Sequence, residues 1–203
     1  MLKLYHAPRS RSSRIVSLIH ELGAGNDIEI VPVTVPRIDG TGGPDPANPH
    51  PEKKVPLLMN GSELIRETVA ITQYLTDLYC EAGMAPAPGA PQRGTYLSWL
   101  AYYAGVVEPV MVMKVAGLTH PVIDVTFRGE AEMVARLAEA LEDRPYLLGD
   151  QYSAADLILA SPFAWMPDAT PDVACIRDWV ARTQDREAVR RTAEQDAAWL
   201  EAA

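Results

Sequence analysis

The fold of the first half of the chain is decided by its opening stretch, LKLYHAPRSRSSRIVSLIHELGAGNDIEIVPV, Leu2–Val33. Its first residues, Leu2–Tyr5, are typical of a short strand, and apolar residues then recur at helical spacing from Ile15 to Leu22. A glycine ends that helix, and the β-branched run Ile28–Val33 predicts a second strand. We therefore expect a βαβ unit whose two strands run parallel.

Outward from this unit, a long loop, a hairpin and a helix complete the first half. Residues 32–54 hold six prolines and three glycines, too many breakers for a regular element. Asn60-Gly61 then separates two apolar runs, Val55–Met59 and Ser62–Ile65, and it is the strongest hairpin signal in the chain. A helix is expected over about Glu67–Glu81.

The second half is separated from the first by a Pro/Gly-rich stretch, GMAPAPGAPQRG, at Gly83–Gly94. This composition predicts a linker, and beyond it no strand pattern occurs. Helical spacing covers Thr95–Ala116, Val122–Glu142, Ala154–Trp165, Val173–Gln184 and Glu187–Leu200. Ser153-Ala154-Ala155-Asp156 forms a capping box in its Asp form. The second half is therefore predicted to be all-α.

Composition excludes several classes of protein. Of the 203 residues, 48% are hydrophobic and 22% charged, so the chain can bury a core and is not disordered. The formal charge of −9 would repel nucleic acid and anionic lipid, and no apolar run reaches the ~20 residues that span a bilayer. Two isolated cysteines, Cys80 and Cys175, indicate neither a disulfide framework nor a metal site. We expect a cytoplasmic protein without metal, nucleic acid or membrane.

The chain resembles the soluble glutathione transferases over nearly its whole length. Four stretches carry the resemblance: LYHAPRSRSSR at Leu4–Arg14, HPEKKVPLL at His50–Leu58, ETVAITQYL at Glu67–Leu75 and YSAADLILASPFAW at Tyr152–Trp165. The resemblance implies an α/β thioredoxin-like glutathione-binding domain over residues 1–82, a linker over 83–94, and an all-α domain over 95–203 with a hydrophobic substrate pocket. It also implies a homodimer with a role in detoxification.

The resemblance assigns the glutathione-binding residues one by one. Pro56 matches the family's cis-proline, and Val55 matches the residue whose backbone pairs with the cysteinyl unit of glutathione. Glu67 and Thr68 match an acidic–hydroxyl pair that holds the γ-glutamyl end, although the family usually has Ser where this chain has Thr. Lys54 matches a basic residue near the glycyl carboxylate. For the pocket, Tyr102, Tyr103 and Met111 are candidates, with ordinary core packing as the alternative.

The catalytic hydroxyl has several candidates in the turn after the first strand. Counted back from Arg14, Ser10 falls on the catalytic serine of theta-like and delta-like classes, so the resemblance implies a serine-type, bacterial-like enzyme. Tyr5 and Ser12 are alternatives: Tyr5 matches the tyrosine of tyrosine-type classes, whereas a serine such as Ser12 or Ser13 before a helix is usually an N-cap. The cysteine of the beta class has no counterpart here.

The implied reaction requires a thiolate. A thiol with a pKa of ~8.5 is about 3% ionised at pH 7, and only the thiolate is strongly nucleophilic. A hydroxyl that donates to sulfur at a helix N-terminus could supply the activation, so no base is required and His6 need not be catalytic. We therefore expect an enzyme that conjugates glutathione, its substrate, to a small hydrophobic electrophile.

Two further functions stay open. One is another glutathione-dependent reaction, such as isomerisation, dehalogenation or disulfide reduction, although Ser10-Arg11-Ser12-Ser13 replaces the signature of the isomerase class. The other is a non-catalytic binding or regulatory protein with the same fold. The retained Lys54, Glu67 and Thr68 argue against the second, because a domain that had lost glutathione would not need them.

Overall fold

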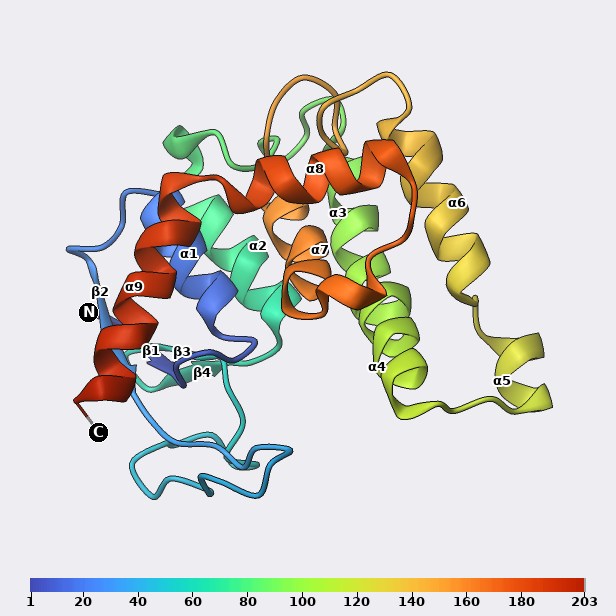
Figure 1. The fold of residues 1–203 in the computed structure, drawn as a ribbon. Coiled ribbons are helices and arrows are strands. Elements are labelled where there is room, and N and C mark those ends of the chain that lie inside the picture. Colours follow the sequence, from blue (N-terminus) through green and yellow to red (C-terminus); the bar gives the residue numbers. More distant parts are fainter. Residues whose placement is uncertain (203) are drawn as a thin grey trace. The chain divides into compact units, whose positions relative to one another are not determined.

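The computed structural model describes residues 1–202 and divides the chain into two compact units (Figure 1). The first unit joins residues 1–82 to the C-terminal segment that begins at Glu187. The second unit is Gly83–Arg186. The first boundary between the units lies between Ala82 and Gly83, and the segment from Glu187 groups with the first unit instead of the second.

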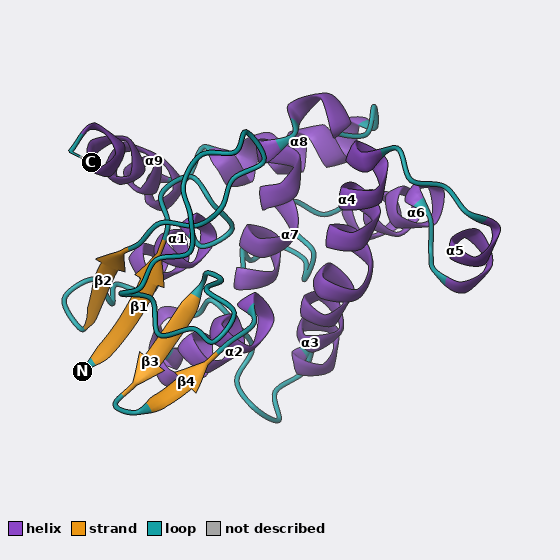
Figure 2. Ribbon diagram, turned by 90° about the horizontal axis from the view of Figure 1, so that it is seen from below, coloured by secondary structure: helices purple, strands orange, loops and turns teal. Residues whose placement is uncertain are grey.

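A four-stranded mixed sheet forms the centre of the first unit (Figure 2). Its strands are β1 (Leu2–His6), β2 (Ile28–Pro32), β3 (Leu57–Asn60) and β4 (Glu63–Ile65), in the order β2-β1-β3-β4. β1 and β2 are parallel, and β3 and β4 form the antiparallel hairpin at Asn60-Gly61, both as predicted. Burial alternates along β1, so every second side chain faces the helices.

Three helices complete this unit: α1 (Ser13–Glu21), α2 (Thr68–Leu78) and α9 (Glu187–Glu201). α1 and α2 lie on one face of the sheet (Figures 1 and 2). α2 is shorter than the expected helix, because Tyr79 leaves helical geometry at φ −110° and a 3₁₀ turn, η1 (Cys80–Ala82), follows.

The position of α9 corrects the prediction that residues 95–203 form one domain. α9 packs on α1, and its buried residues Ala188, Thr192 and Asp196 recur every four positions along one face. The hydroxyl of Ser17 on α1 donates to Oγ1 of Thr192 at 2.9 Å. The all-helical sequence pattern of the second half did not reveal this, because helical spacing shows which face is buried and not what covers it.

The second unit is all-helical, as predicted. Its elements are α3 (Arg93–Tyr102), the π-helical turn η2 (Tyr103–Val107), α4 (Glu108–Ala116), α5 (Pro121–Thr126), α6 (Glu130–Leu141), α7 (Ala154–Trp165), the 3₁₀ turn η3 (Pro167–Ala169) and α8 (Ala174–Gln184). Two expected helices are interrupted. The π turn divides the first, and extended backbone at Phe127 and Gly129 divides α5 from α6.

α7 is the central helix of this unit, and its N-terminus carries the predicted capping box. The Asp156 carboxylate accepts hydrogen bonds from the N–H of Ser153 at 3.0 Å and of Leu147 at 2.8 Å, and from Nε1 of Trp179 at 3.0 Å. Asp156 is fully buried. Burial raises its pKa, and the hydrogen bonds from Leu147, Trp179 and Ser153 oppose that shift.

Candidate active site

The register of the sheet brings the predicted glutathione-site residues of the first unit to one end. Tyr5 on β1 pairs with Leu57 on β3, so the antiparallel register places Val55 beside the chain that leaves β1. Leu58 on β3 pairs with Ile65 on β4, so the start of α2 lies at the same end. The Ser10 turn, Val55 and the N-terminus of α2 therefore lie at the same end of the sheet.

Ser10 lies in the turn between β1 and α1 and is partly exposed. Its Oγ is 2.7 Å from Oγ of Ser12 and accepts a hydrogen bond from the Ser12 N–H at 3.1 Å. The turn is held from outside by Arg37, whose guanidinium donates to the carbonyls of Pro8 and Arg9 at 2.7 and 3.2 Å. The long loop before β3 thus helps to fix the backbone that carries Ser10.

Ser12 is fully buried, and its hydroxyl makes no cap of α1. Its φ and ψ of −74° and −18° are helical, whereas a capping residue needs extended geometry for its side chain to reach back to the helix. Oγ instead lies 2.8 Å from Nδ1 of His6 and accepts from the N–H of Ala7 at 3.1 Å. Ser12 therefore occupies the expected N-cap position of α1, but its hydroxyl does not cap the helix.

Ser13 is not a cap either. It is the first residue of α1, and its hydroxyl donates to Oδ2 of Asp196 at 2.6 Å. Its Oγ also accepts a hydrogen bond from the N–H of Ser10 at 3.2 Å. Ser13 therefore connects the candidate catalytic turn to α9.

Asp196 and His6 form a buried pair beneath this turn. Both residues are almost fully buried, and Nε2 of His6 is 2.8 Å from Oδ1 of Asp196. Oδ2 accepts from the N–H of Arg9 at 2.6 Å as well as from Ser13. Burial raises the pKa of Asp196, but the hydrogen bonds from His6, Ser13 and Arg9 outweigh it, and the net pKa is lowered. The Trp199 indole lies against the His6 ring, with centroids 5.2 Å apart.

The order Asp196–His6–Ser12 has the connectivity of a Ser-His-Asp triad, but Ser12 cannot act as its nucleophile. A nucleophilic oxygen must reach the substrate, and Ser12 has no exposed surface. Ser10 is the first partly exposed hydroxyl along the chain of contacts. Tyr5, by the alternation along β1, projects to the face of the sheet opposite His6.

Val55 and Pro56 are the residues to which the resemblance assigns the binding of the glutathione backbone. The Val55–Pro56 peptide bond is cis, which confirms the geometry expected for Pro56. The N–H and C=O of Val55 make no hydrogen bond to the rest of residues 1–202, so both groups are available to a ligand. Lys54 is exposed.

Glu67 and Thr68 lie at the N-terminus of α2. Glu67 is the N-cap position, is exposed and has φ +71°, which a non-glycine residue rarely adopts. Thr68 begins the helix. Two further residues with positive φ, Arg9 and Lys53, adjoin the other predicted site residues. Residues with strained backbone are often found at ligand sites, and these three lie beside the predicted site residues Ser10, Lys54 and Thr68.

Comparison with known proteins gives the family. The model of the glutathione S-transferase N-terminal domain matches residues 4–83, and that of the C-terminal domain matches residues 110–187. The chain belongs to the glutathione S-transferase family. The predicted thioredoxin-like plus all-α fold class, the family and the glutathione transferase class of enzyme are thereby confirmed.

Individual relatives agree with this assignment. Glutathione S-transferase GstA of Escherichia coli O157:H7 is 26% identical over 166 residues, which cover 81% of this chain and 82% of that protein. The glutathione transferase structure of Methylococcus capsulatus is 25% identical, with a TM-score of 0.78 over 98% of this chain and 100% of that one. A sphingomonad glutathione S-transferase complexed with glutathione is also 25% identical, with a TM-score of 0.72 over 96% and 98% of the two chains.

Sequence reasoning missed Asn48 and Asp196, two residues whose hydrogen bonds hold the backbone around the candidate site. Asn48 is fully buried, and its side chain donates to the carbonyl of Lys54 at 3.0 Å, while Nζ of Lys53 donates to the Asn48 carbonyl at 2.6 Å. Asp196 was also missed, although an acidic residue in line with Ala188 and Thr192 on a buried helix face is a signal for a buried partner. Asn48 sits in a Pro-rich loop without periodicity, so no pattern indicates it.

The pocket candidates of this transferase lie in the second unit, where Tyr102, Tyr103 and Met111 are buried. The guanidinium of Arg136 lies 4.1 Å from the centroid of the Tyr102 ring. Burial raises the pKa of Tyr102, and its hydroxyl has no hydrogen-bond partner among residues 1–202. Their burial favours a packing role, and a contribution to substrate binding stays a prediction.

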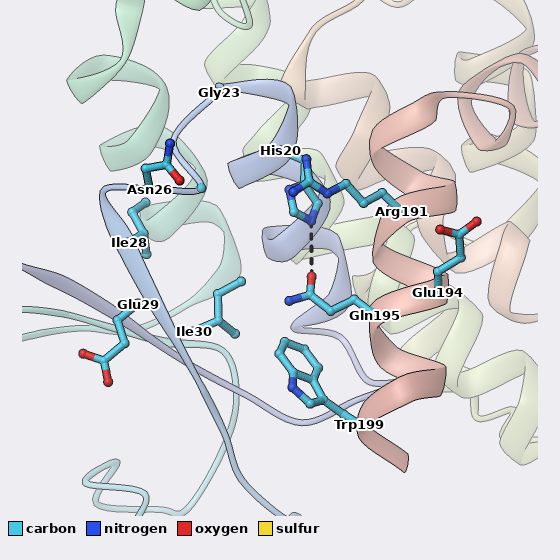
Figure 3. Close-up of a pocket in the computed structure, with 11 residues that line it drawn as sticks. His20, Gly23, Asn26, Ile28, Glu29, Ile30, Arg191, Glu194, Gln195 and Trp199 are labelled. Atoms are coloured by element: carbon cyan, nitrogen blue, oxygen red, sulfur yellow. Dashed lines mark hydrogen bonds between the residues drawn. The ribbon is translucent and has the colours of Figure 1, made fainter. Parts of the chain in front are cut away.

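A hollow of about 720 Å³ in the first unit contains none of the predicted site residues (Figure 3). It lies between the end of α1, β2 and α9 and includes His20, Arg191 and Trp199. Nε2 of His20 lies 3.3 Å from Oε1 of Gln195. Burial and then the Arg191 charge lower the pKa of His20. This hollow is separate from the edge that carries Ser10, Val55 and Glu67.

No helix among residues 1–202 is both long and apolar enough to cross a bilayer. No group of three or more His, Cys, Asp or Glu side chains there is placed to hold a metal ion.

Proposed function

We propose that this glutathione S-transferase conjugates glutathione to a small hydrophobic electrophile, and that Ser10 stabilises the thiolate. The observation that carries the proposal is the convergence of Ser10, Val55 and the start of α2 at one end of the sheet. An extended peptide bound at that end of the sheet could pair its backbone with Val55. Its γ-glutamyl carboxylate would then lie at the N-terminus of α2, where the helix dipole favours negative charge. Lys54 would lie near the glycyl carboxylate.

The thiol would then lie beside the Ser10 turn. A hydroxyl donating to sulfur, close to the N-terminus of α1 and to the cations Arg9 and Arg11, could lower the thiol pKa by about two units, roughly 2.7 kcal/mol. The thiolate sulfur would form a bond to an electrophilic carbon, whose leaving group departs with its electron pair. Ser10 is preferred over Tyr5 because it lies in the turn at the N-terminus of α1, whereas Tyr5 projects from β1 to the face of the sheet opposite His6.

The relatives support the choice of ligand. One of the similar structures was solved in complex with glutathione, and the strand register puts Val55 and the start of α2, which the resemblance assigns to this ligand, at one end of the sheet. We extend the proposal to a cytoplasmic homodimer, on the resemblance to the family. Sedimentation of the full chain at several concentrations tests the dimer.

The test of the proposal is the ultraviolet absorbance of the bound thiolate as a function of pH, in the unmodified protein and in Ser10→Ala. Loss of one charge-assisted hydrogen bond, about 1.5–3 kcal/mol, should raise the bound thiol pKa by about one to two units, with little loss of glutathione affinity. Tyr5→Phe is the matched control and should leave the titration in place. An upward shift in Tyr5→Phe alone would instead identify a tyrosine-type enzyme.

Calorimetry separates binding from activation. Glutathione should bind to both variants, because Val55 and the α2 N-terminus are distinct from the activating hydroxyl. Binding without any thiolate would favour a non-catalytic binding protein. No binding at millimolar glutathione would overturn the proposal.

A further inference from the structure

A continuous chain of short contacts runs from α9 to Ser10. Oδ1 of Asp196 is 2.8 Å from Nε2 of His6, and Nδ1 of His6 is 2.8 Å from Oγ of Ser12. Oγ of Ser12 is in turn 2.7 Å from Oγ of Ser10. The first three residues are buried and the fourth is partly exposed, so the chain has one end that a ligand can reach.

The chemistry of the groups restricts where the hydrogens lie. An ionised Asp196 can only accept, so Nε2 of His6 carries a hydrogen. In the neutral imidazole Nδ1 is then an acceptor for the Ser12 hydroxyl, and at 2.8 Å it is nearer than the other acceptor of that hydroxyl, the Ala7 carbonyl at 3.3 Å. Oγ of Ser12, which also accepts from Ala7, can take the Ser10 hydrogen. In this state the Ser10 hydrogen points inward and cannot donate to a thiolate.

The opposite polarity requires one more proton. If Nδ1 of His6 is protonated it donates to Ser12, Ser12 donates to Ser10, and the Ser10 hydrogen is free to point outward. The positive imidazolium is then paired with the Asp196 carboxylate at 2.8 Å. The same three contacts therefore support two hydrogen-bond directions that differ by a single proton on His6.

We propose that His6 accepts the thiol proton of glutathione through Ser12 and Ser10, and that Asp196 stabilises the imidazolium that results; this rests on the function proposed above. The thiol hydrogen passes to Oγ of Ser10, the Ser10 hydrogen to Oγ of Ser12, and the Ser12 hydrogen to Nδ1 of His6. One S–H bond breaks, one N–H bond forms, and no proton enters or leaves. Ser10 ends as a donor to the thiolate.

The surroundings of His6 suit this role. The charged group that contacts its ring is Asp196, from α9. On its other sides it meets the Ser12 hydroxyl, the Trp199 indole and β2, where it pairs with Pro32. Neither His6 nor Asp196 touches the substrate, so both are positioning residues that act through Ser12 and Ser10. The sequence indicated that His6 need not be catalytic, and the relay gives this residue a testable role in accepting the proton.

The experiment counts protons. Glutathione binding to the full chain is measured near pH 7.5 by calorimetry in buffers of different ionisation enthalpy, which gives the protons released to solvent. Ultraviolet absorbance gives the thiolate formed in the same samples. We expect the ratio of protons released to thiolate formed to be near zero in the unmodified protein, because His6 retains the proton. A ratio near one would overturn the relay.

Variants then locate the acceptor. His6→Asn keeps a hydrogen-bonding side chain that cannot take a proton, and Ser12→Ala breaks the path while leaving the His6–Asp196 pair in place. Each variant should raise the pKa of the bound thiol by about one unit, which lowers the ratio of thiolate to thiol about tenfold. The thiolate that still forms should release its proton to solvent, so the ratio of protons released to thiolate formed should be near one. An unchanged ratio in a folded Ser12→Ala would contradict the path.

The control is Thr192→Val, which removes the buried hydrogen bond between α1 and α9 without touching the chain of contacts. It should weaken the packing of α9 and leave both the thiol pKa and the proton ratio unchanged. Equal shifts in Thr192→Val and His6→Asn would show that the pair only holds α9 in place. If Ser10→Ala raises the thiol pKa but the proton ratio of the unmodified protein is one, the relay fails and the proposed function stands. No thiolate at all would overturn both.

Discussion

Two buried carboxylates, Asp156 in the second unit and Asp196 in the first, are each held by several hydrogen bonds and differ in what surrounds them. The donors to Asp156 are two backbone N–H groups, a serine hydroxyl and the Trp179 indole. The donors to Asp196 include His6, which can change its charge, and Ser13 and Arg9 at a partly exposed turn. The pKa of Asp156 is raised mainly by burial, whereas that of Asp196 is lowered by its hydrogen bonds despite burial.

The difference separates a structural carboxylate from one suited to chemistry. A carboxylate surrounded by fixed, non-titrating donors stabilises one conformation and has nothing to exchange. A carboxylate beside an imidazole that leads to a partly exposed hydroxyl can stabilise a charge that appears during the reaction. Burial alone would not have distinguished them, since both residues are almost fully buried.

The largest expected effect is on Asp156. Asp156→Ala leaves the Leu147 N–H and the Trp179 Nε1–H buried without an acceptor, and each such group costs about 1–3 kcal/mol. We expect the free energy of unfolding to fall by about 3–5 kcal/mol in urea titrations, and the bound thiol pKa to stay unchanged in the folded fraction. A change in the pKa of the bound thiol would show that Asp156, like Asp196, acts on the thiol.

Asp196→Ala should lower the free energy of unfolding less than Asp156→Ala does, and it should change the pKa of the bound thiol more. The abandoned donors on Arg9 and Ser13 are exposed or partly exposed and can find water, which leaves Nε2–H of His6 as the one buried donor of the three. We therefore expect a loss of about 1–3 kcal/mol in the free energy of unfolding. The bound thiol pKa should nevertheless rise. Denaturant titration and the ultraviolet titration of bound glutathione measure the two quantities. A stability loss as large as that of Asp156→Ala would place Asp196 in the structural class.

Glu67 is an exposed carboxylate with which the two buried carboxylates can be compared. Because it is exposed at the N-terminus of α2, it should contribute only about 0.3–1 kcal/mol to the helix. Glu67→Ala should therefore weaken glutathione binding, measured by calorimetry, while the free energy of unfolding changes little. Equal losses of binding and stability would show that Glu67 is merely structural.

The smallest effect is a pair of pH slopes with opposite signs. The folded pKa of Asp196 lies below its ordinary value of 3.8, so only the unfolded chain takes up a proton as the pH first falls below that value. Its contribution to stability is therefore present at higher pH and lost as the pH falls through the folded pKa. The folded pKa of Asp156 lies above 3.8, so its contribution is present at lower pH and is lost as the pH rises.

Urea titrations of Asp196→Asn and Asp156→Asn over about pH 3–6 measure these slopes against the unmodified protein. The difference in unfolding free energy, unmodified minus variant, should rise with pH for Asp196 and fall for Asp156. Slopes of the same sign would mean that the hydrogen bonds to Asp156 outweigh its burial.

Much of the fold followed from local patterns. The βαβ unit, the Asn60-Gly61 hairpin and the capping box at Ser153–Asp156 each depend on neighbouring residues, and each is found in the structure. The cis geometry of Pro56 followed from the resemblance and is also found. The breaks within two helices of the second unit were not predicted, because helical spacing continues across the π turn and across Phe127–Gly129.

The candidate site was predicted in part. Sequence reasoning placed Ser10, Val55 and Glu67 in one domain, and the strand register then brings them to one edge. It assigned Ser12 to a cap, and the structure instead turns that hydroxyl inward to His6. His6 is next to the turn in sequence, but its partner Asp196 lies on the last helix.

By itself, the sequence determined the order of elements, the parallel strand pair, the hairpin and the family, because each depends on residues close together in the chain or on a motif read in place. Only the tertiary structure decided that α9 packs on α1 and that Asp196 meets His6. The physical reason is that a pattern along a helix encodes which face is buried, whereas the donor that satisfies a buried carboxylate can come from any part of the chain that packing brings near. Here it comes from the opposite end of the chain.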